Sequence, residues 1–317
     1  MNLIHNPVML NTVIKSLNIK DGGTYVDCTF GRGGHSKNIL KKIGKTGKLI
    51  AIDKDEEARK YALDNFSKDK RFVFEKNSFS NLVSIIEKYN ESKKVNGILL
   101  DLGVSSPQLD NPKRGFSFMK EGPIDMRMDT KNKLTALLWL KEENEDAIAN
   151  ILRLYGEEKY AYKIARSIKK AIENDLLKTT IDLSKIISEC YPKSKRYKKN
   201  PATKSFQAIR IFINKELEEL EKILNQCLDV IALGGRIVVI SFHSLEDRIV
   251  KNFINNQSIA KDVPSNLPIT NFEKKLNLKK IKIPLHATKE EILQNVRARS
   301  AKIRVAEKIW VILKFIQ

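Results

Sequence analysis

Strand and helix signals alternate through the first hundred residues, and this alternation restricts the possible fold more than any other feature. Short apolar segments at 24–28, 48–53, 71–75 and 95–101 have the composition of buried strands, and helical patterns separate them. Such alternation is typical of a parallel sheet that helices cover on both faces. We therefore predict an α/β fold with a Rossmann-like sheet.

The alternation is interrupted in the middle of the chain. Residues 105–132 are rich in proline and glycine, as loops are, and residues 134–190 have helical patterns throughout. One long helix is expected from Ala202 to Leu224, because apolar residues recur there at helical spacing. Further strands are expected at 236–241, 280–283 and 301–306.

These elements suggest a domain organisation. A length of 317 residues suits two domains, or one domain with a large insertion. The most economical assembly is one α/β domain made of residues 1–110 and 203–317. A mainly helical domain, residues 111–202, is then inserted between its fourth and fifth strands.

The chain is strongly basic, with a net charge of +20 and a pI near 9.7. Many lysines and arginines raise the affinity for a polyanion through counterion release. Nucleotide bias can scatter lysines over a surface, but it does not easily explain the dense basic run Lys193–Lys199, which contains Tyr197. We expect a nucleic-acid partner and no membrane, since no long basic helix with a bulky apolar face is visible.

Cysteine and histidine usage narrows the class of protein further. Cys28, Cys190 and Cys227 are odd in number and far apart, which argues against a disulfide scaffold and fits reduced thiols. The four histidines are scattered and no Cys-x-x-Cys occurs, so no metal site is expected. Neither a membrane span nor a secretory signal is visible, and we expect a cytoplasmic protein.

A glycine-rich loop follows the first predicted strand. The pattern Asp27-x-x-x-Gly31-x-Gly33-Gly34 opens a helix, and Asp53 ends the next strand, where a carboxylate can accept both hydroxyls of a ribose. The dinucleotide-binding motif Gly-x-Gly-x-x-Gly has a third glycine, and Ser36 occupies that position here. This difference favours a cofactor without phosphates. The alternative is a turn that serves only chain geometry; carboxylates at two strand ends argue against it.

The segment after the fourth predicted strand is expected to hold the methyl acceptor of a methyltransferase. Reacting groups in open α/β sheets gather at the carboxyl ends of strands, and Asp101 stands at such an end. The following Ser105, Ser106 and Pro107 resemble the Ser/Asp-Pro-Pro-aromatic segment of amino-methyltransferases, in which a carbonyl and a polar side chain hold an exocyclic amine. By this resemblance the three residues position the acceptor amine, and Gln108 replaces the aromatic residue.

The motifs of the whole chain resemble one family closely, the bacterial small-subunit ribosomal RNA cytosine-N4 methyltransferases. The longest are DCTFGRGGHS at 27–36 and GILLDLGVSSPQLD at 97–110. The others are Arg114–Phe118, Gly122–Asp129, Tyr155–Glu158, Pro201–Arg210 and Ile240–Arg248. Departures are small: Val296 replaces a usual proline, and Ile124 replaces a leucine.

The resemblance implies an activity and a set of site residues. It implies a class I methyltransferase that moves a methyl group from S-adenosylmethionine to the N4 amine of cytidine 1402 in 16S rRNA, within the small ribosomal subunit. The inserted domain would recognise the RNA. The cofactor contacts carried over by motif are Gly33, Gly34, His35, Asp53, Phe79, Asp101 and Gln108. Phe79 is expected at the end of the third strand, with its ring against the adenine.

Residues that contact the RNA are less constrained by the sequence. Arg210 belongs to a polar stripe with Gln207 and Asn214, which either lines the catalytic cleft or forms an ordinary solvated face. Ser241 and His243 follow the fifth strand and are expected on the substrate side. The alternative for His243 is a structural hydrogen-bonding role, which is common for a lone histidine. Ser244 and Asp247 have the spacing of a helix capping box.

The sequence leaves open which residues contact phosphate, and it leaves two alternatives to rRNA methylation. Arg114, Arg127 and the basic run are candidate phosphate contacts, or else solvated charges. Methylation at C5 of the ring would need a thiolate, usually from a Pro-Cys loop, and no cysteine here follows a proline. A DNA amino-methyltransferase and a non-catalytic RNA-binding module are the alternatives. The oligomeric state is not predicted.

Overall fold

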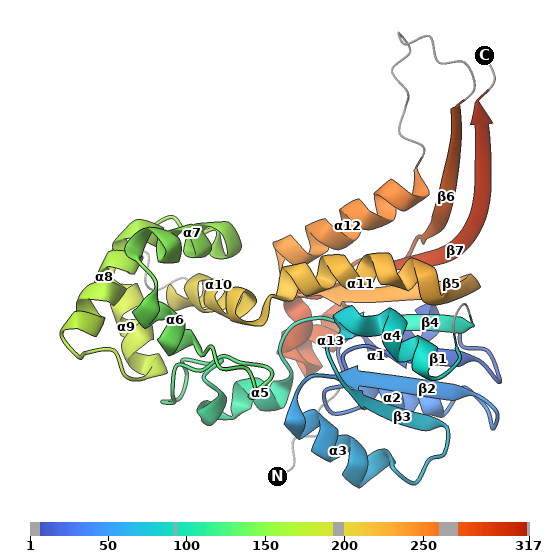
Figure 1. The fold of residues 1–317 in the computed structure, drawn as a ribbon, viewed down its shortest axis with the longest axis horizontal. Coiled ribbons are helices and arrows are strands. Elements are labelled where there is room, and N and C mark those ends of the chain that lie inside the picture. The colour runs from blue at the N-terminus through green and yellow to red at the C-terminus, as the bar shows by residue number, and fades with distance from the viewer. Residues whose placement is uncertain (1–6, 92–93, 193–199, 260–271, 316–317) are drawn as a thin grey trace. The chain divides into compact units, whose positions relative to one another are not determined.

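The computed structural model describes residues 7–91, 94–192, 200–259 and 272–315. The chain forms two compact units, drawn in Figure 1: unit 1 is Met1–Gly103 with Leu217–Gln317, and unit 2 is Val104–Glu216. The basic run Lys193–Lys199 lies outside the described residues. Within the described ranges, no helix is both long and apolar enough to cross a membrane.

Unit 1 is built on a seven-stranded sheet with the order β3-β2-β1-β4-β5-β7-β6. The strands are β1 (Thr24–Asp27), β2 (Lys48–Asp53), β3 (Phe72–Lys76), β4 (Val95–Asp101), β5 (Ile231–Ser241), β6 (Phe272–Ile281) and β7 (Lys302–Phe315). The first five pair in parallel, and β7 and β6 add an antiparallel edge. The predicted α/β fold class is confirmed.

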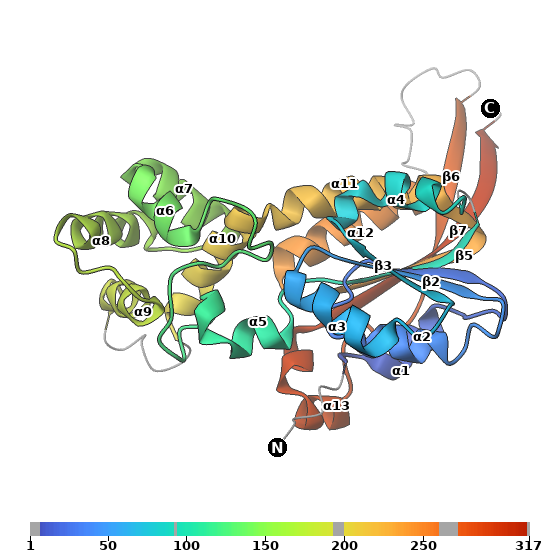
Figure 2. The same cartoon turned by 60° about the horizontal axis from the view of Figure 1, so that its bottom comes forward.

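Helices cover both faces of this sheet, as Figure 2 shows. They are α1 (Leu10–Ser16), α2 (Gly34–Leu40), α3 (Glu56–Phe66), α4 (Leu82–Lys88), α11 (Glu216–Val230) and α12 (Ser244–Ser258), with α13 (Lys289–Gln294) near the C-terminus. Side chains alternate between the faces along a strand. On β2, Ile50 and Ile52 pack in the core with α4, α11 and α12, while Leu49 and Ala51 pack with α1, α2 and α3. Burial on both faces explains the continuous apolar runs.

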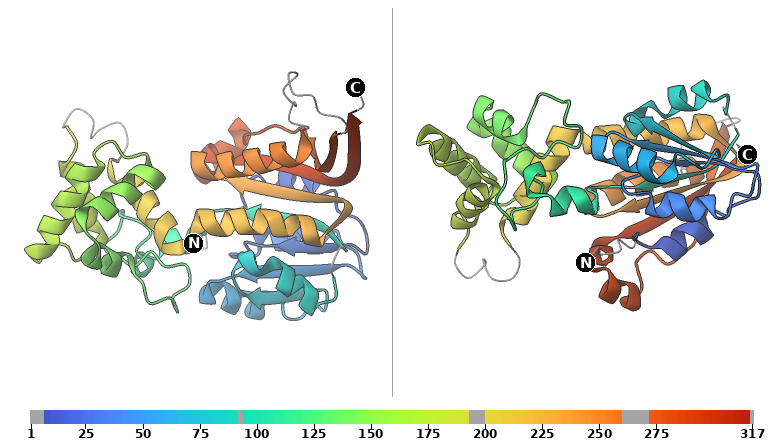
Figure 3. Two further views of the ribbon diagram at one scale, coloured as in Figure 1. Left: turned by 45° about the horizontal axis from the view of Figure 1, so that its top comes forward. Right: turned by 90° about the horizontal axis from the view of Figure 1, so that it is seen from below.

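Unit 2 is helical and has a hydrophobic core of its own. Its helices are α5 (Ser106–Asp110), α6 (Ala136–Glu142), α7 (Glu145–Gly156), α8 (Ala161–Glu173), α9 (Thr180–Glu189) and α10 (Ala202–Asn214), coloured green to yellow in Figure 3. Side chains of Thr135, Asn144 and Thr179 cap α6, α7 and α9 by accepting backbone N–H bonds. Trp139 and Phe212 stack with ring centroids 4.7 Å apart in the core.

The boundaries of unit 2, Val104 and Glu216, differ from the predicted boundaries of the inserted domain, 111 and 202. The continuous helix expected from Ala202 to Leu224 is wrong, because Lys215 takes a left-handed backbone with φ of 52° and separates α10 from α11. Phe206, Ile209 and Ile213 on α10 belong to the unit 2 core. This packing keeps α10 in unit 2, so the return to unit 1 comes at Leu217.

Candidate cofactor site at the carboxyl edge of the sheet

The glycine loop between β1 and α2 is held against the end of β2. Phe30 N–H donates to the carbonyl of Ile52 at 3.1 Å, and Gly31 N–H donates to Asp53 Oδ2 at 2.8 Å. Gly33 has a φ of 66°, and a Cβ there would lie 2.5 Å from Cζ of Phe66. Only glycine combines this left-handed backbone with so close an approach. The loop therefore brings bare backbone to the strand edge, as close contact with a ligand requires.

Asp53 stands at the end of β2 with its carboxylate facing this loop. Its Oδ1 accepts from Asp55 N–H at 2.9 Å, in addition to the Gly31 bond on Oδ2. Burial raises the pKa of Asp53 to about 6, although both backbone bonds oppose the shift. A carboxylate offers about four lone-pair sites, so each oxygen keeps the capacity to accept a hydroxyl. This arrangement fits the predicted ribose contact.

His35 and Asp101 come together beside the loop. Asp101 ends β4, and its Oδ2 lies 3.5 Å from Nε2 of His35, the second residue of α2. Both ring nitrogens of His35 and Oδ1 of Asp101 are buried without a hydrogen-bond partner in the part of the chain that the structure describes. Leaving a buried polar atom unpaired costs about 1–3 kcal/mol. Three such atoms at one place are able to bind the polar groups of a ligand.

Sequence reasoning missed the hydroxyl groups that organise this edge. Thr29 Oγ1 accepts from the N–H of Asp101 at 2.7 Å, which ties the loop to β4. Ser36 donates to Asp27 Oδ2 at 2.7 Å, and Asp27 Oδ1 accepts from Thr29 N–H at 3.2 Å. Burial raises the pKa of Asp27. The signal was available, because both hydroxyl residues lie within the motif at 27–36.

Gly34 and Phe79 take different positions relative to this edge. Gly34 is the first residue of α2, and a Cβ there would lie 2.4 Å from Cγ of Pro7. Phe79 does not end a strand as expected; β3 ends at Lys76, and Phe79 begins a short 3₁₀ helix, Phe79–Asn81. Its half-buried ring packs on the core beneath α4 and α11. Its predicted contact with the adenine stays a prediction.

The predicted acceptor segment lies in unit 2 and forms the start of α5. Ser105 and Gln108 form a capping box in which Ser105 N–H donates to Gln108 Oε1 at 2.8 Å. The carbonyls of Ser105 and Pro107 accept from backbone N–H groups one turn further on. The Ser106 hydroxyl, in contrast, is buried with no partner among the described residues. In this segment, Ser106 therefore fits an external N–H donor best.

Most of the predicted RNA-side residues have partners within their own unit. Arg210 forms two hydrogen bonds of 2.8 Å with Glu216, and Asn214 is buried, where it binds the backbone of Met126 and Met128. Gln207 Nε2 donates to the carbonyl of Tyr155 at 3.4 Å. The polar stripe on α10 is thus neither a bare cleft wall nor a purely solvated face.

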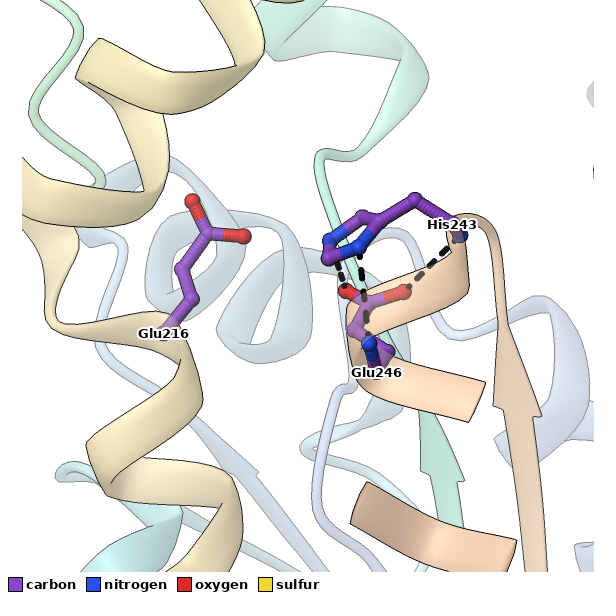
Figure 4. Close-up of side chains that lie close together, drawn as sticks. All are labelled: Glu216, His243 and Glu246. Atoms are coloured by element: carbon purple, nitrogen blue, oxygen red, sulfur yellow. Dashed lines mark hydrogen bonds and ion pairs between the residues drawn. The ribbon is translucent and has the colours of Figure 1, made fainter. Parts of the chain in front are cut away.

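His243 and Glu246 sit together where α12 begins, as Figure 4 shows. His243 Nδ1 accepts from Glu246 N–H at 3.4 Å, and its Nε2 lies 3.1 Å from Glu246 Oε1. The predicted capping box of Ser244 and Asp247 is therefore wrong by one residue. Asp247 is instead an ion-pair partner of Arg304, and the buried Ser241 hydroxyl donates to the carbonyl of Lys302 at 3.4 Å.

The two candidate phosphate-binding arginines are structural in this chain. Arg114 is buried, and its Nη2 donates to the carbonyls of Arg127 and Met128 at 3.0 Å. Arg127 forms an ion pair with Asp125 at 2.7 Å. Both side chains organise the loop before α6. The alternative of a solvated charge is therefore wrong for Arg114, which is buried. Phosphate contact stays a prediction for both arginines.

The raised pKa of Asp53 predicts a pH dependence of cofactor binding. Two ribose hydroxyls need the carboxylate form, so protonation of Asp53 competes with binding. The apparent dissociation constant for S-adenosylmethionine, the cofactor that the resemblance implies, should be flat above pH 7 and rise about tenfold per pH unit below about 6. Isothermal titration calorimetry between pH 5 and pH 8 measures this. A constant affinity down to pH 5 would exclude Asp53 as a charged contact.

The fold and this edge define a class of protein: a Rossmann-like α/β protein in which a glycine loop, two carboxylates and unpaired polar atoms gather at the carboxyl ends of parallel strands. A model of the MraW methylase family matches residues 2–309. Ribosomal RNA small subunit methyltransferase H of Hydrogenovibrio crunogenus is 48% identical over 305 residues, 96% of each chain. The protein of that name from Ruthia magnifica is 49% identical, covering 96% of this chain and 98% of that one.

The similarity extends over nearly the whole of both chains, and the chain belongs to the MraW methylase family. It is an S-adenosylmethionine-dependent methyltransferase. Among solved structures, an rRNA methylase from Streptococcus thermophilus is 11% identical with a TM-score of 0.40, and covers 97% of this chain and 99% of that one.

Proposed function

We propose that this enzyme transfers a methyl group from S-adenosylmethionine to the N4 amine of cytidine 1402 of 16S rRNA in the small ribosomal subunit. The observation that carries the proposal is the identity of 48–49% to small-subunit rRNA methyltransferases H over 96% of the chain. The cofactor site at the strand edge of unit 1 supports the same chemistry. A cytoplasmic location, where ribosomes are, goes with this function.

The cysteines support transfer to nitrogen rather than to C5 of the ring. C5 methylation requires a thiolate that attacks C6. Cys28, Cys190 and Cys227 are all buried, and burial raises the pKa of each thiol. None of them is placed or activated as a nucleophile. An exocyclic amine needs no such group.

The residues of this chain are proposed to position the reactants. When bound, S-adenosylmethionine supplies a methyl group on a sulfonium, which is a good leaving group. Gly33, Gly34 and His35 would hold it with Asp53 and Asp101, and Phe79 and Gln108 stay proposed contacts. The substrate amine must be placed in line with the methyl group, and such positioning is a large part of catalysis.

The acceptor amine is proposed to meet the segment Ser105–Pro107. An N–H bond of the amine directed at the buried Ser106 hydroxyl oxygen would draw the nitrogen lone pair out of conjugation with the ring. The proton leaves the nitrogen after methyl transfer, so no strong base is required. Arg210, Ser241 and His243 remain proposed RNA-side residues. We propose RNA recognition as the role of unit 2.

The decisive experiment offers the purified enzyme three acceptors with S-adenosylmethionine: small subunits from a strain that lacks the activity, free 16S rRNA and duplex DNA. Nucleosides are identified by mass spectrometry, and the modified position is mapped on rRNA fragments. We expect N4-methylcytidine at position 1402 in the subunits. N4-methyldeoxycytidine in DNA alone would indicate a DNA amino-methyltransferase. RNA binding without any methyl transfer would indicate a binding module.

A further inference from the structure

We infer that the outer side of α12 and the adjoining end of β6 bind the phosphate backbone of the RNA substrate. We call the exposed cations Arg248, Lys251, Lys280 and Lys282 the basic face. The inference rests on the proposed function, because it takes the substrate to be rRNA. It adds a docking surface in unit 1, separate from the cofactor residues and from unit 2.

The acidic residues of α12 are turned away from this surface. Glu246 is buried and accepts from Phe242 N–H at 2.8 Å. Asp247 is buried and pairs with Arg304 at 2.6 Å and Lys302 at 3.2 Å on β7. The helix contains no other acid. Its exposed positions therefore carry only positive charge, from Arg248 and Lys251, beside amides such as Asn252.

The lysines at the end of β6 lie on the same side of the sheet as α12. Lys280 is opposite Ala306 in the antiparallel register, and Ala306 packs in one core with Val250 and Ile254 of α12. Directly opposed residues project to the same face of a sheet. The neighbours Ile281 and Ile283 pack in the other core, which leaves Lys280 and Lys282 on the α12 side.

A further contact fixes the helix against the strand. Asn277 Nδ2 on β6 donates to Gln257 Oε1 on α12 at 2.7 Å. Leu278 of β6 is buried in the core that also holds Val250 and Ile254. These contacts pack α12 against β6, and Figure 1 shows the helix running toward β6 and β7.

The neighbouring helix α11 differs from α12 in its exposed charges. It exposes Glu218, Glu221 and Asp229 beside Lys222. Lysines on an edge strand such as β6 also discourage pairing with other sheets. That role does not account for the cations on α12, which is a helix. Among the residues whose side chains the structure describes, Arg248, Lys251, Lys280 and Lys282 place charge of one sign on α12 and at the end of β6, which fits a polyanion.

The position of the basic face suits a substrate that reaches the cofactor site. α12 begins three residues after Ser241, the last residue of β5. In the sheet register, Ile240 of β5 pairs with Asp101 of β4, so α12 starts at the edge where the cofactor residues lie. RNA bound along α12, which is about 22 Å long, would extend to this edge.

The test reverses two charges and compares the result with a matched control. Lys251→Glu/Lys280→Glu alters the basic face, and Lys42→Glu/Lys60→Glu makes the same charge change at exposed positions on the α2 and α3 side. We measure the Kd for small subunits against salt by filter binding, the KM and kcat for methyl transfer, and the Kd for S-adenosylmethionine. Lys251→Arg/Lys280→Arg keeps the charge.

We expect the basic-face variant to bind subunits at least about tenfold more weakly, with a slope of log Kd against log salt lower by about 2. Its KM should rise while kcat and the cofactor Kd hold, and the arginine variant should behave as wild type. Equal weakening in the control and basic-face variants would overturn the inference. Because binding is measured apart from catalysis, a wild-type enzyme that binds subunits without methylating them would count against the proposed function alone.

Discussion

Asp53→Asn should weaken the binding of S-adenosylmethionine by about 100-fold or more while leaving the fold intact. Each hydrogen bond from a ribose hydroxyl to a charged carboxylate contributes about 1.5–3 kcal/mol, and two such bonds are proposed. The amide loses the charge and one of the two acceptors that hold Gly31 and Asp55. Calorimetric titration with S-adenosylmethionine measures the change in Kd.

The free energy of unfolding distinguishes a loss of cofactor contacts in Asp53→Asn from unfolding of the variant. Burial raises the pKa of Asp53 to about 6, so the carboxylate is held against its own preference at neutral pH. The amide does not have the cost of a buried charge, and this gain offsets the lost backbone hydrogen bond. The free energy of unfolding measured in urea should therefore change little. Asp64→Asn, an exposed position on α3, makes the same charge change and should leave Kd unaltered. Unchanged affinity in Asp53→Asn would contradict the ribose contact.

Gly33→Ala should remove cofactor binding and destabilise unit 1 by about 2–5 kcal/mol. The left-handed backbone costs an alanine about 1–2 kcal/mol, and overpacking costs about 1–3 kcal/mol. The overpacking arises because the new Cβ would lie 2.5 Å from Phe66 and 2.7 Å from Phe30. The loop must move to relieve this contact, and misplacement by about 1 Å can cost about 100-fold in activity.

Gly234→Ala is the matched control for this variant. Gly234 also has a left-handed backbone, with a φ of 74°, but a Cβ there would meet nothing within 4 Å. Gly234→Ala should lower the free energy of unfolding only by the cost of the left-handed backbone, about 1–2 kcal/mol. It should bind the cofactor as the wild type does. The free energy of unfolding in urea and the cofactor Kd are measured for both variants. Equal losses in both would mean that the contacts of Gly33 with the two rings are unimportant.

The strands β1, β2 and β4 were predictable because they are buried on both faces, so that their sequences are mostly apolar. Asp53 and Asp101 could be placed at strand ends for the same reason: each is the first charged residue after such a run. The break between α10 and α11 was not predictable in this way. Lys215 has no special backbone preference, and apolar spacing continues across it; the left-handed turn follows from packing within unit 2.

Side-chain partners were harder to predict than elements. Arg114 reads as a surface cation, yet its guanidinium binds two carbonyls that lie 13 and 14 residues further along the chain. His243 was expected on the substrate side, and the structure also makes it the cap of α12. Such contacts depend on the tertiary structure, which brings distant backbone groups together. The unpaired atoms of His35 and Asp101 likewise became visible only in three dimensions.

A crystal structure of the enzyme with S-adenosylhomocysteine bound would locate the cofactor site. We expect the ribose hydroxyls on the Asp53 carboxylate and the nucleoside against the loop that contains Gly33. We also expect polar atoms of the ligand to pair with the buried groups of His35 and Asp101. A ligand bound elsewhere, or a ribose without contact to Asp53, would contradict the assignment of the cofactor site.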